Sequence, residues 1–188
     1  AAAGAGTVAK AISKHYNLFY LDTGKIYRFI AYLKIKYPKK FKNSFIKKKI
    51  KLLRVKDLSD KNLLSNQVSL ESSKISKFKS IRKIVHSFQL NFAYNPPSKY
   101  NGSCLDGRDI TYNIMPDADF KFYITANLKT RALRRFKELK SINNKITYND
   151  VLKSIKNRDK SDKNRNVAPL KKTKDSLLIN TTNLTKRA

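Results

Sequence analysis

The chain has 188 residues, 40% of them apolar, which suits one folded domain with a sizeable core and room for a small insert. Its single cysteine excludes an intramolecular disulfide and a cysteine-rich zinc cluster, and such usage is typical of a reducing, cytoplasmic setting. The sequence has no apolar run long enough to predict a membrane-spanning helix.

The formal net charge of +29 suggests a nucleic-acid partner, because Lys and Arg side chains neutralise phosphates. The densest basic run, Lys39–Lys56, is the candidate for such a surface. Most of the excess, however, comes from lysines spread along the whole chain beside many asparagines and isoleucines. This distribution favours a general compositional bias over a built patch, so a nucleic acid is the less favoured partner.

The N-terminal part of the chain is predicted to form a helix, a strand and a second helix. Val8, Ala9 and Ile12 follow a helical spacing. Asn17–Asp22 is a short apolar run that ends in a carboxylate, which is typical of a buried strand. Gly24–Tyr37 then has a helical pattern, which the following proline ends.

The middle of the chain is less regular. Residues 39–67 are rich in Lys and Asn and weakly patterned, so we expect an insert or loosely packed helices there. Val68–Tyr94 predicts another helix or a pair of helices, which the sequence NPP ends.

The C-terminal half alternates strands and helices, and this order favours a parallel α/β sheet. Strands are expected where short apolar runs end at polar turns, and amphipathic helices where apolar residues recur every three or four positions. The predicted strands are Ser103–Asp106, Asp119–Ala126 and Ser176–Asn180, and the predicted helices are Leu128–Ser141 and Tyr148–Asp159.

The chain opens with AAAGAGT, a run of small residues before a helix. Small residues let backbone N–H groups curl around phosphate oxygens at the N-terminus of the helix that follows. Thr7 could place its hydroxyl on a magnesium ion. The run lacks the first glycine and the lysine of the phosphate-loop motif G-x-x-x-x-G-K-[ST], so by itself it does not establish a nucleotide site.

Four polar segments add to this evidence. LDTGKIYR and LDGRD each follow a predicted strand, and RALRR opens a helix after another strand. RDKSDKNRNVAPL is expected to be a polar loop that holds Arg158, Asp162 and Arg165. Because guanidinium groups bind phosphate oxygens in pairs, arginines at strand ends and in loops predict a phosphate-binding crevice at the carboxyl edge of the sheet.

In this order, the segments LD-T-G-x-I-Y-R, D-G-R-D-I, P-D-A-D and R-N-x-x-P-L resemble the bacterial cytidylate kinases, which are nucleoside monophosphate kinases of the P-loop group. The resemblance runs from residue 1 to about Leu184 and weakens over residues 34–67. It implies an α/β fold with three layers, in which helices flank a parallel sheet, in a single domain over residues 1–188. It also implies a shortened NMP-binding insert at about 34–67 and a lid at about 158–168.

The activity that the resemblance implies is transfer of the γ-phosphoryl group of ATP to CMP or dCMP, with Mg²⁺ as cofactor, by a monomer that needs no membrane. The expected catalytic residues are Arg108, Asp106 and Arg165. The expected ATP-binding residues are Ala2, Ala3, Gly4, Ala5, Gly6, Thr7, Arg131 and Arg134, with the neighbouring Arg135. The expected CMP-binding residues are Thr23, Arg28, Ser73, Arg82, Arg108, Asp109, Arg158, Asp162 and Arg165.

The same resemblance implies how the acceptor residues divide their roles. It assigns the acceptor phosphate to Arg28, Arg108 and Arg165, and the sugar to Arg158 and Asp162. It assigns the pyrimidine pocket to Thr23, Ser73, Arg82 and Asp109, and the magnesium ion or its loop to Asp106. A carboxylate at Asp109 would accept a hydrogen bond from the N4 amine of cytosine and oppose the O4 of uracil, so the pocket should select cytosine.

The sequence departs from the family pattern at the phosphate loop. Ala5 stands where the family has a lysine that neutralises donor phosphates, so we expect turnover to be reduced by orders of magnitude. The strand that feeds this loop and a closing helix after Leu184 are absent from the given sequence, and we expect truncation at both ends. The alternative function is a catalytically inactive relative that binds nucleotide or RNA through its basic surface.

Overall fold

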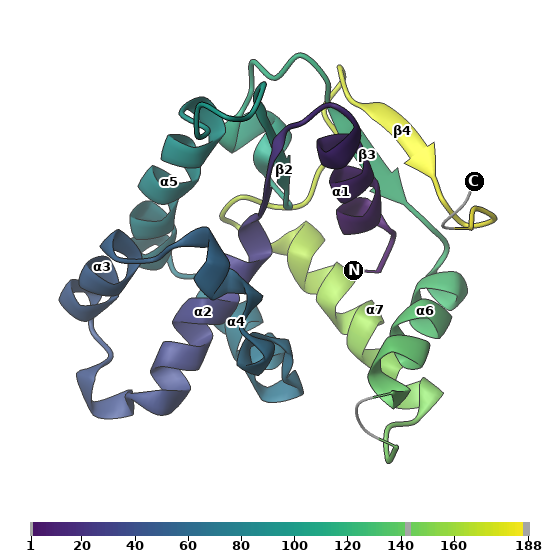
Figure 1. Ribbon diagram of the computed structural model, residues 1–188. Helices are drawn as coiled ribbons and strands as arrows, with labels where there is room; N and C mark the ends of the chain where they lie inside the picture. The colour runs from purple at the N-terminus through teal and green to yellow at the C-terminus, as the bar shows by residue number, and fades with distance from the viewer. Residues whose placement is uncertain (1, 142–143, 186–188) are drawn as a thin grey trace.

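The computed structural model describes residues 2–141 and 144–185, and its helices outnumber its strands (Figure 1). The helices are α1 (Ala5–His15), α2 (Thr23–Lys36), α3 (Asn43–Lys51), α4 (Asn66–Ile75), α5 (Lys79–Tyr94), α6 (Leu128–Lys140) and α7 (Tyr148–Asn164). The strands are β1 (Phe19–Asp22), β2 (Ser103–Asp106), β3 (Phe122–Thr125) and β4 (Leu177–Asn180). A π-helical segment, Ile110–Ile114, follows β2.

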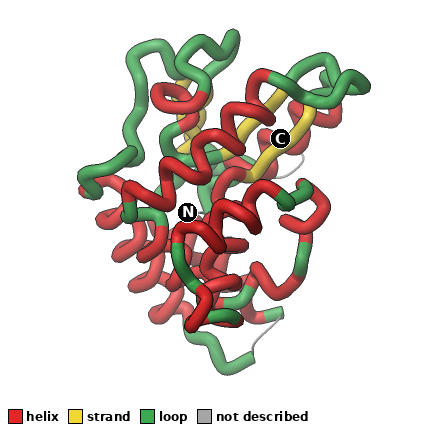
Figure 2. The backbone as a smooth tube through the Cα atoms, turned by 90° about the vertical axis from the view of Figure 1, so that its left-hand side faces the viewer, coloured by secondary structure: helices red, strands yellow, loops and turns green. Residues whose placement is uncertain are grey.

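The strands form two parallel pairs, β1 with β2 and β3 with β4, and they lie in the upper part of the molecule in Figure 2. Within residues 2–141 and 144–185, β2 pairs only with β1 and β3 only with β4. The register of the first pair sets Asp22 opposite Asp106. Both carboxylates therefore lie at the carboxyl ends of adjacent strands.

Local sequence signals explain where several helices begin and end. The Asp22 carboxylate caps α2 by accepting from the Gly24 N–H at 3.0 Å, and Pro38 follows the end of that helix. Asn127 caps α6 and Thr147 caps α7 in the same way. The Asp22 cap places the first turn of α2 directly after β1, beside the strand-end carboxylates.

The main core is built around α2. Ile26 and Ile30 are fully buried, and they lie in one cluster with Leu21 of β1 and Ile46 of α3. The weakly patterned segment 39–67 therefore does not consist of loosely packed helices, because its apolar side chains complete this core. The sequence pattern is weak there because lysines surround the few buried positions.

A smaller apolar cluster joins α6 to α7 through Ala132, Val151 and Ile155. In Figure 1 these two helices lie on the opposite side of the molecule from α2 to α5. Of the helices that the structure describes, none combines the length and apolar character needed to span a membrane.

We predict that Ile46→Ala, which removes a side chain only 1% exposed, lowers the free energy of unfolding by about 2–4 kcal/mol. Leu52, next to the end of α3 and 65% exposed, provides the matched control, and Leu52→Ala should change the stability by less than about 0.5 kcal/mol. Urea unfolding of both variants measures the difference. Equal effects would mean that α3 is not part of the core.

Candidate active site

A cavity of about 1460 Å³ runs along β1, β2 and β3, from Leu18 and Gly102 just before the first two strands to Asp22 and Asp106 at their carboxyl ends. Its volume exceeds that of the usual small-molecule pocket of about 300–1,000 Å³ because it includes the space between β2 and β3, which do not pair with each other. Its walls include every predicted acceptor-site residue and the small-residue loop at residues 2–7. Segments that are far apart in the sequence thus meet at one cavity.

The small-residue loop turns into α1 through Gly4. Gly4 has φ of +90°, a left-handed conformation that glycine adopts readily, and its carbonyl accepts from the N–H groups of Thr7 and Val8 at 2.9 and 3.0 Å. No residue that the structure describes accepts from the N–H of Ala5 or Gly6. These two N–H groups at the start of a helix are ready donors for an anion.

Asp106 lies beneath this loop, and a Cβ atom added at Gly6 would come within 3.1 Å of its Oδ2. Burial first, and then the charge of Asp22, raise the pKa of Asp106 to about 6. The Thr23 hydroxyl donates to the Asp106 carbonyl at 2.8 Å, which fixes the backbone at the strand end. The site therefore holds a half-buried carboxylate beside a second one, Asp22, and this combination favours its protonated form.

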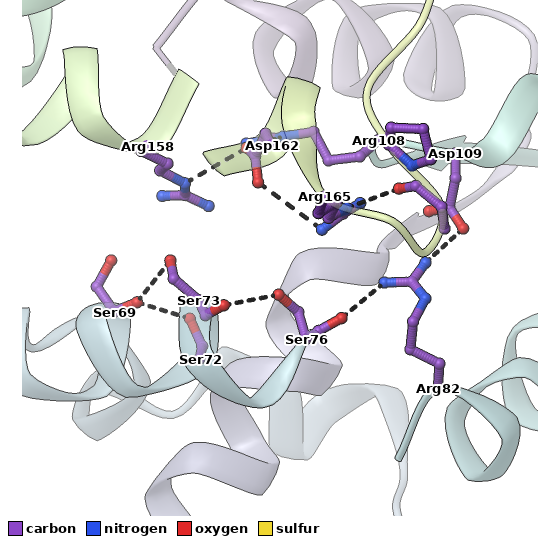
Figure 3. Close-up of polar contacts among 12 residues, drawn as sticks. Ser69, Ser72, Ser73, Ser76, Arg82, Arg108, Asp109, Arg158, Asp162 and Arg165 are labelled. Carbon is purple, nitrogen blue, oxygen red and sulfur yellow. Dashed lines mark hydrogen bonds and ion pairs between the residues drawn. The ribbon is translucent and has the colours of Figure 1, made fainter. Parts of the chain in front are cut away.

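The other side of the cavity has the opposite charge. Arg108, Arg158 and Arg165 surround the carboxylate of Asp162, as Figure 3 shows. Arg108 Nε donates to Asp162 Oδ2 at 2.9 Å, whereas Arg158 and Arg165 lie 3.8 and 3.7 Å from the carboxylate oxygens. We call these three residues and Arg28 the arginine cluster.

The arginine cluster carries more positive charge than Asp162 can neutralise. Burial by itself would raise the pKa of Asp162, but Arg108 and the other arginines hold that pKa below its ordinary value. Burial and the nearby Arg108 lower the pKa of Arg158 to about 10. The buried Nε of Arg158 also has no hydrogen-bond partner among the described residues. An anion in the cavity would supply the missing charge and acceptor.

Arg28 joins the cluster from α2. Its two terminal nitrogens donate to the Leu63 carbonyl at 2.9 Å and to the Ser69 hydroxyl at 3.2 Å. Ser73 lies one turn further along α4, lines the same cavity, and donates to the Ser69 carbonyl at 3.3 Å (Figure 3). The segment 39–67 thus contributes a backbone carbonyl that orients a site arginine.

Arg82 and Asp109 form a buried ion pair in which Arg82 Nη2 donates to Asp109 Oδ2 at 2.5 Å. The Ser76 carbonyl accepts from Arg82 Nη1 at 3.2 Å, and the guanidinium lies over the ring of Tyr27, 5.4 Å from its centroid. Tyr27 was not predicted as a site residue, although it directly precedes Arg28 in a segment already singled out. The ring and the carbonyl thus hold the Arg82 side of this ion pair in place.

The cytidylate kinase sequence profile matches residues 1–188. The chain belongs to the cytidylate kinase family. It is 38% identical to the cytidylate kinase of Bartonella tribocorum over 98% of this chain and 84% of that protein. It is 38% identical to the enzyme named cytidylate kinase in Clostridium botulinum strain Loch Maree, over 98% of this chain and 88% of that one. It is 36% identical to the cytidylate kinase of Mesomycoplasma hyopneumoniae strain 7448, over 97% of this chain and 83% of that protein. The resemblance inferred from the sequence motifs is confirmed.

The three arginines near the start of α6 in this cytidylate kinase family member, which the resemblance assigned to ATP, are not equivalent. Arg131 forms an ion pair with Asp159 at 2.6 Å, and Arg134 donates to the carbonyls of Thr181 and Leu184 at 2.6 and 3.0 Å. Neither of them lines the cavity, whereas Arg135 does. Three neighbouring arginines on one helix look alike in the sequence, and only the helix orientation separates them.

The sequence predicted a polar loop that holds Arg158, Asp162 and Arg165. This prediction is wrong for Arg158 and Asp162, which lie in a helix. α7 continues to Asn164, so Arg158 and Asp162 project from the last turns of a helix, and Arg165 ends it. A helix is possible here because the polar residues face the cavity and solvent while Ile155 continues the buried stripe. The chain then turns back, and the Leu170 N–H donates to the Asp162 carbonyl at 2.7 Å.

We predict that Asp106→Asn stabilises the protein at neutral pH. Because the folded pKa of about 6 exceeds the ordinary value of 3.8, the ionised carboxylate destabilises the folded state increasingly as pH rises through this interval. The gain should reach about 3 kcal/mol near pH 7.5 and be small near pH 4. Urea unfolding at both pH values, without nucleotide or magnesium, measures it.

Asp57→Asn is the control for this prediction. The backbone N–H of Arg54 lowers the pKa of Asp57, so this substitution should cause a loss of stability rather than a gain. A gain for Asp106→Asn that is the same near pH 4 and near pH 7.5 would contradict the assignment of the effect to the buried charge.

Proposed function

We propose that this chain transfers the γ-phosphoryl group of ATP to CMP or dCMP. The observation that carries the proposal is the arginine cluster, whose charge exceeds that of Asp162 and which faces the same cavity as the small-residue loop. Phosphoryl transfer between two nucleotides needs positioning and positive charge more than covalent chemistry, and this arrangement supplies both. Family membership supports the same reaction.

On the acceptor side, Arg28, Arg108 and Arg165 bind the phosphate of CMP in this proposal. Arg165 Nε already donates to the Ala168 carbonyl at 2.7 Å, so its other nitrogens remain for phosphate and for Asp162. Arg158 and Asp162 contact the sugar. Sugar binding would draw Asp162 partly away from the arginines and release their donors to the phosphate.

Base selection rests on Asp109 and Arg82. Their buried ion pair, with exposures of 4% and 8%, holds a carboxylate at the cavity wall where water competes little. Cytosine offers an N4–H donor to this carboxylate, and uracil would place its O4 acceptor against it. A buried acceptor left without its donor, or faced by a second acceptor, disfavours the wrong base strongly. Thr23 and Ser73 complete the walls of the pocket.

On the donor side, the N–H groups of Ala5 and Gly6, which have no acceptor among the described residues, and the start of α1 bind ATP phosphates. Arg135, rather than Arg131 or Arg134, supplies a cation to the donor phosphates, because it alone of the three lines the cavity. Arg135 also lowers the pKa of Arg28 and of Arg158, which indicates that its charge reaches the arginine cluster.

The half-buried Asp106 and the neighbouring Asp22 fit a magnesium ion, since two adjacent carboxylates offer the hard oxygen ligands that it prefers. The described residues contain no group of three or more acidic, His or Cys side chains that could hold a metal alone, so water and ATP phosphates would complete its shell. Thr7 is a further hydroxyl ligand in this proposal. The bound ion would neutralise phosphate charge, while Asp106 and Asp22 hold and orient it.

We also infer that the two strand pairs are halves of one three-layer sheet, with a parallel strand between β2 and β3 that leads into the small-residue loop. Residues of both β2 and β3 line the same cavity, and neither strand has another partner among the residues described. Backbone groups at two facing edges need hydrogen-bond partners, and one strand would satisfy both edges.

The proposed function predicts that this chain releases ADP from ATP faster with CMP or dCMP than with UMP. The kcat/KM for CMP should exceed that for UMP by at least about 100-fold, and Asp109→Asn should remove most of the preference. A coupled ADP-release assay with each acceptor measures this. Equal values for CMP and UMP in the parent protein would overturn the assignment of the base pocket.

A second prediction concerns Ala5. The lysine side chain of Ala5→Lys would reach the donor phosphates and stabilise charge that shifts during transfer, so kcat should rise by about 10²–10⁴-fold. CMP affinity, measured by calorimetry, should stay within about twofold because the acceptor site is built from other segments. Similar kcat values for parent and variant would mean that another cation, first of all Arg135, already fills this role.

A further inference from the structure

One contact in the base pocket comes from a residue that no motif singled out. Asn113 lies four residues after Asp109, in the π-helical segment Ile110–Ile114. Its backbone N–H donates to the Asp109 carbonyl at 3.0 Å, and its side-chain Nδ2 donates to Asp109 Oδ2 at 2.8 Å. One residue therefore binds both the main chain and the carboxylate of Asp109.

The backbone around Asn113 is built to make this contact. The Met115 N–H donates to the Ile110 carbonyl at 2.8 Å, which closes the wide turn of a π-helix, a rare geometry that is frequent at functional sites. The Asn113 carbonyl lies 3.2 Å from His86 Nε2, one turn beyond Arg82 on α5. Asn113 and Asp109 thus face His86 and Arg82 across the gap between two helical segments.

The two donors to Asp109 reach the same oxygen. Arg82 Nη2 and Asn113 Nδ2 both donate to Oδ2, whereas Oδ1 accepts from none of the described residues. The terminal torsion of an aspartate is soft, so one hydrogen bond would leave the carboxylate plane poorly fixed. Two donors from different directions fix that plane, and Oδ1 remains for a ligand in the cavity that Asp109 lines.

We infer that Asn113 is a positioning residue for base selection, which holds Asp109 so that Oδ1 accepts from the exocyclic amine of cytosine. The inference rests on the proposed function, because it takes the cavity beside Asp109 as the base pocket. An amide donates without carrying charge, so it orients the carboxylate without adding a cation that would attract the O4 of uracil. Asn113 is itself exposed, so water partly replaces its contact and a moderate effect is expected.

The test measures the dissociation constants of CMP and UMP by calorimetry, which does not require turnover. For Asn113→Leu, CMP binding should weaken by about 3–10-fold while UMP binding stays within about twofold, so that the ratio of the two constants changes. Asn91→Leu is the matched control, since it makes the same chemical change at an exposed position of α5. It should leave both constants unchanged.

Two further variants separate the possible outcomes. Asn113→Asp keeps the shape and removes the donor, so it should reduce the CMP preference even if Asn113→Leu does not fold. Asp109→Asn tests the pocket itself. If Asp109→Asn changes the CMP-to-UMP ratio but neither Asn113 variant does, the role of Asn113 is refuted and the pocket stands. If Asp109→Asn leaves the ratio unchanged, the base-pocket assignment fails and the inference fails with it.

Discussion

The arrangement of the cavity depends on the ion pairs that the Asp162 carboxylate makes with three arginines. This carboxylate lies between Arg108, which follows β2, and Arg158 and Arg165 of the α7 end, and it keeps these cations together before any ligand arrives. Like charges at such distances repel strongly when buried, so the cluster needs an internal anion in order to fold. Because one carboxylate cannot neutralise three guanidinium groups, the cluster keeps an excess of positive charge, and our proposal assigns this excess to the acceptor phosphate.

The opposite sign of charge prevails a short distance away, at the ends of β1 and β2. Asp22 and Asp106 lie side by side there because the strands are parallel and in register. The Asp22 carboxylate also caps α2, whereas the Asp106 main-chain carbonyl accepts from the Thr23 hydroxyl. The acidic strand ends and the arginine cluster thus divide the cavity into a part suited to a cation and a part suited to anions. Transfer of a phosphoryl group needs both, since magnesium and arginine act on the same phosphate oxygens.

Much of the site could be predicted because its residues lie in short segments with fixed spacing. Thr23 and Arg28 follow β1, and Arg108 and Asp109 follow β2, so strand order alone brings them to one edge. The choice among Arg131, Arg134 and Arg135 could not be made, because it depends on how α6 is rotated against α7 and β4. Asn113 could not be predicted either, since its contact requires a π-helical turn that no residue pattern announces.

The sequence by itself determined the family, the order of helices and strands, and the segments that carry the arginines, because each of these depends on local spacing and on motifs of a few residues. Tertiary structure decided the rest. It showed that α7 continues through Arg158 and Asp162, that residues 39–67 complete the core, and that Arg82 pairs with Asp109 over Tyr27. The core and the ion pair depend on which side chains meet across many positions of the chain, 27 for Arg82 and Asp109, and only packing of the whole chain fixes such contacts.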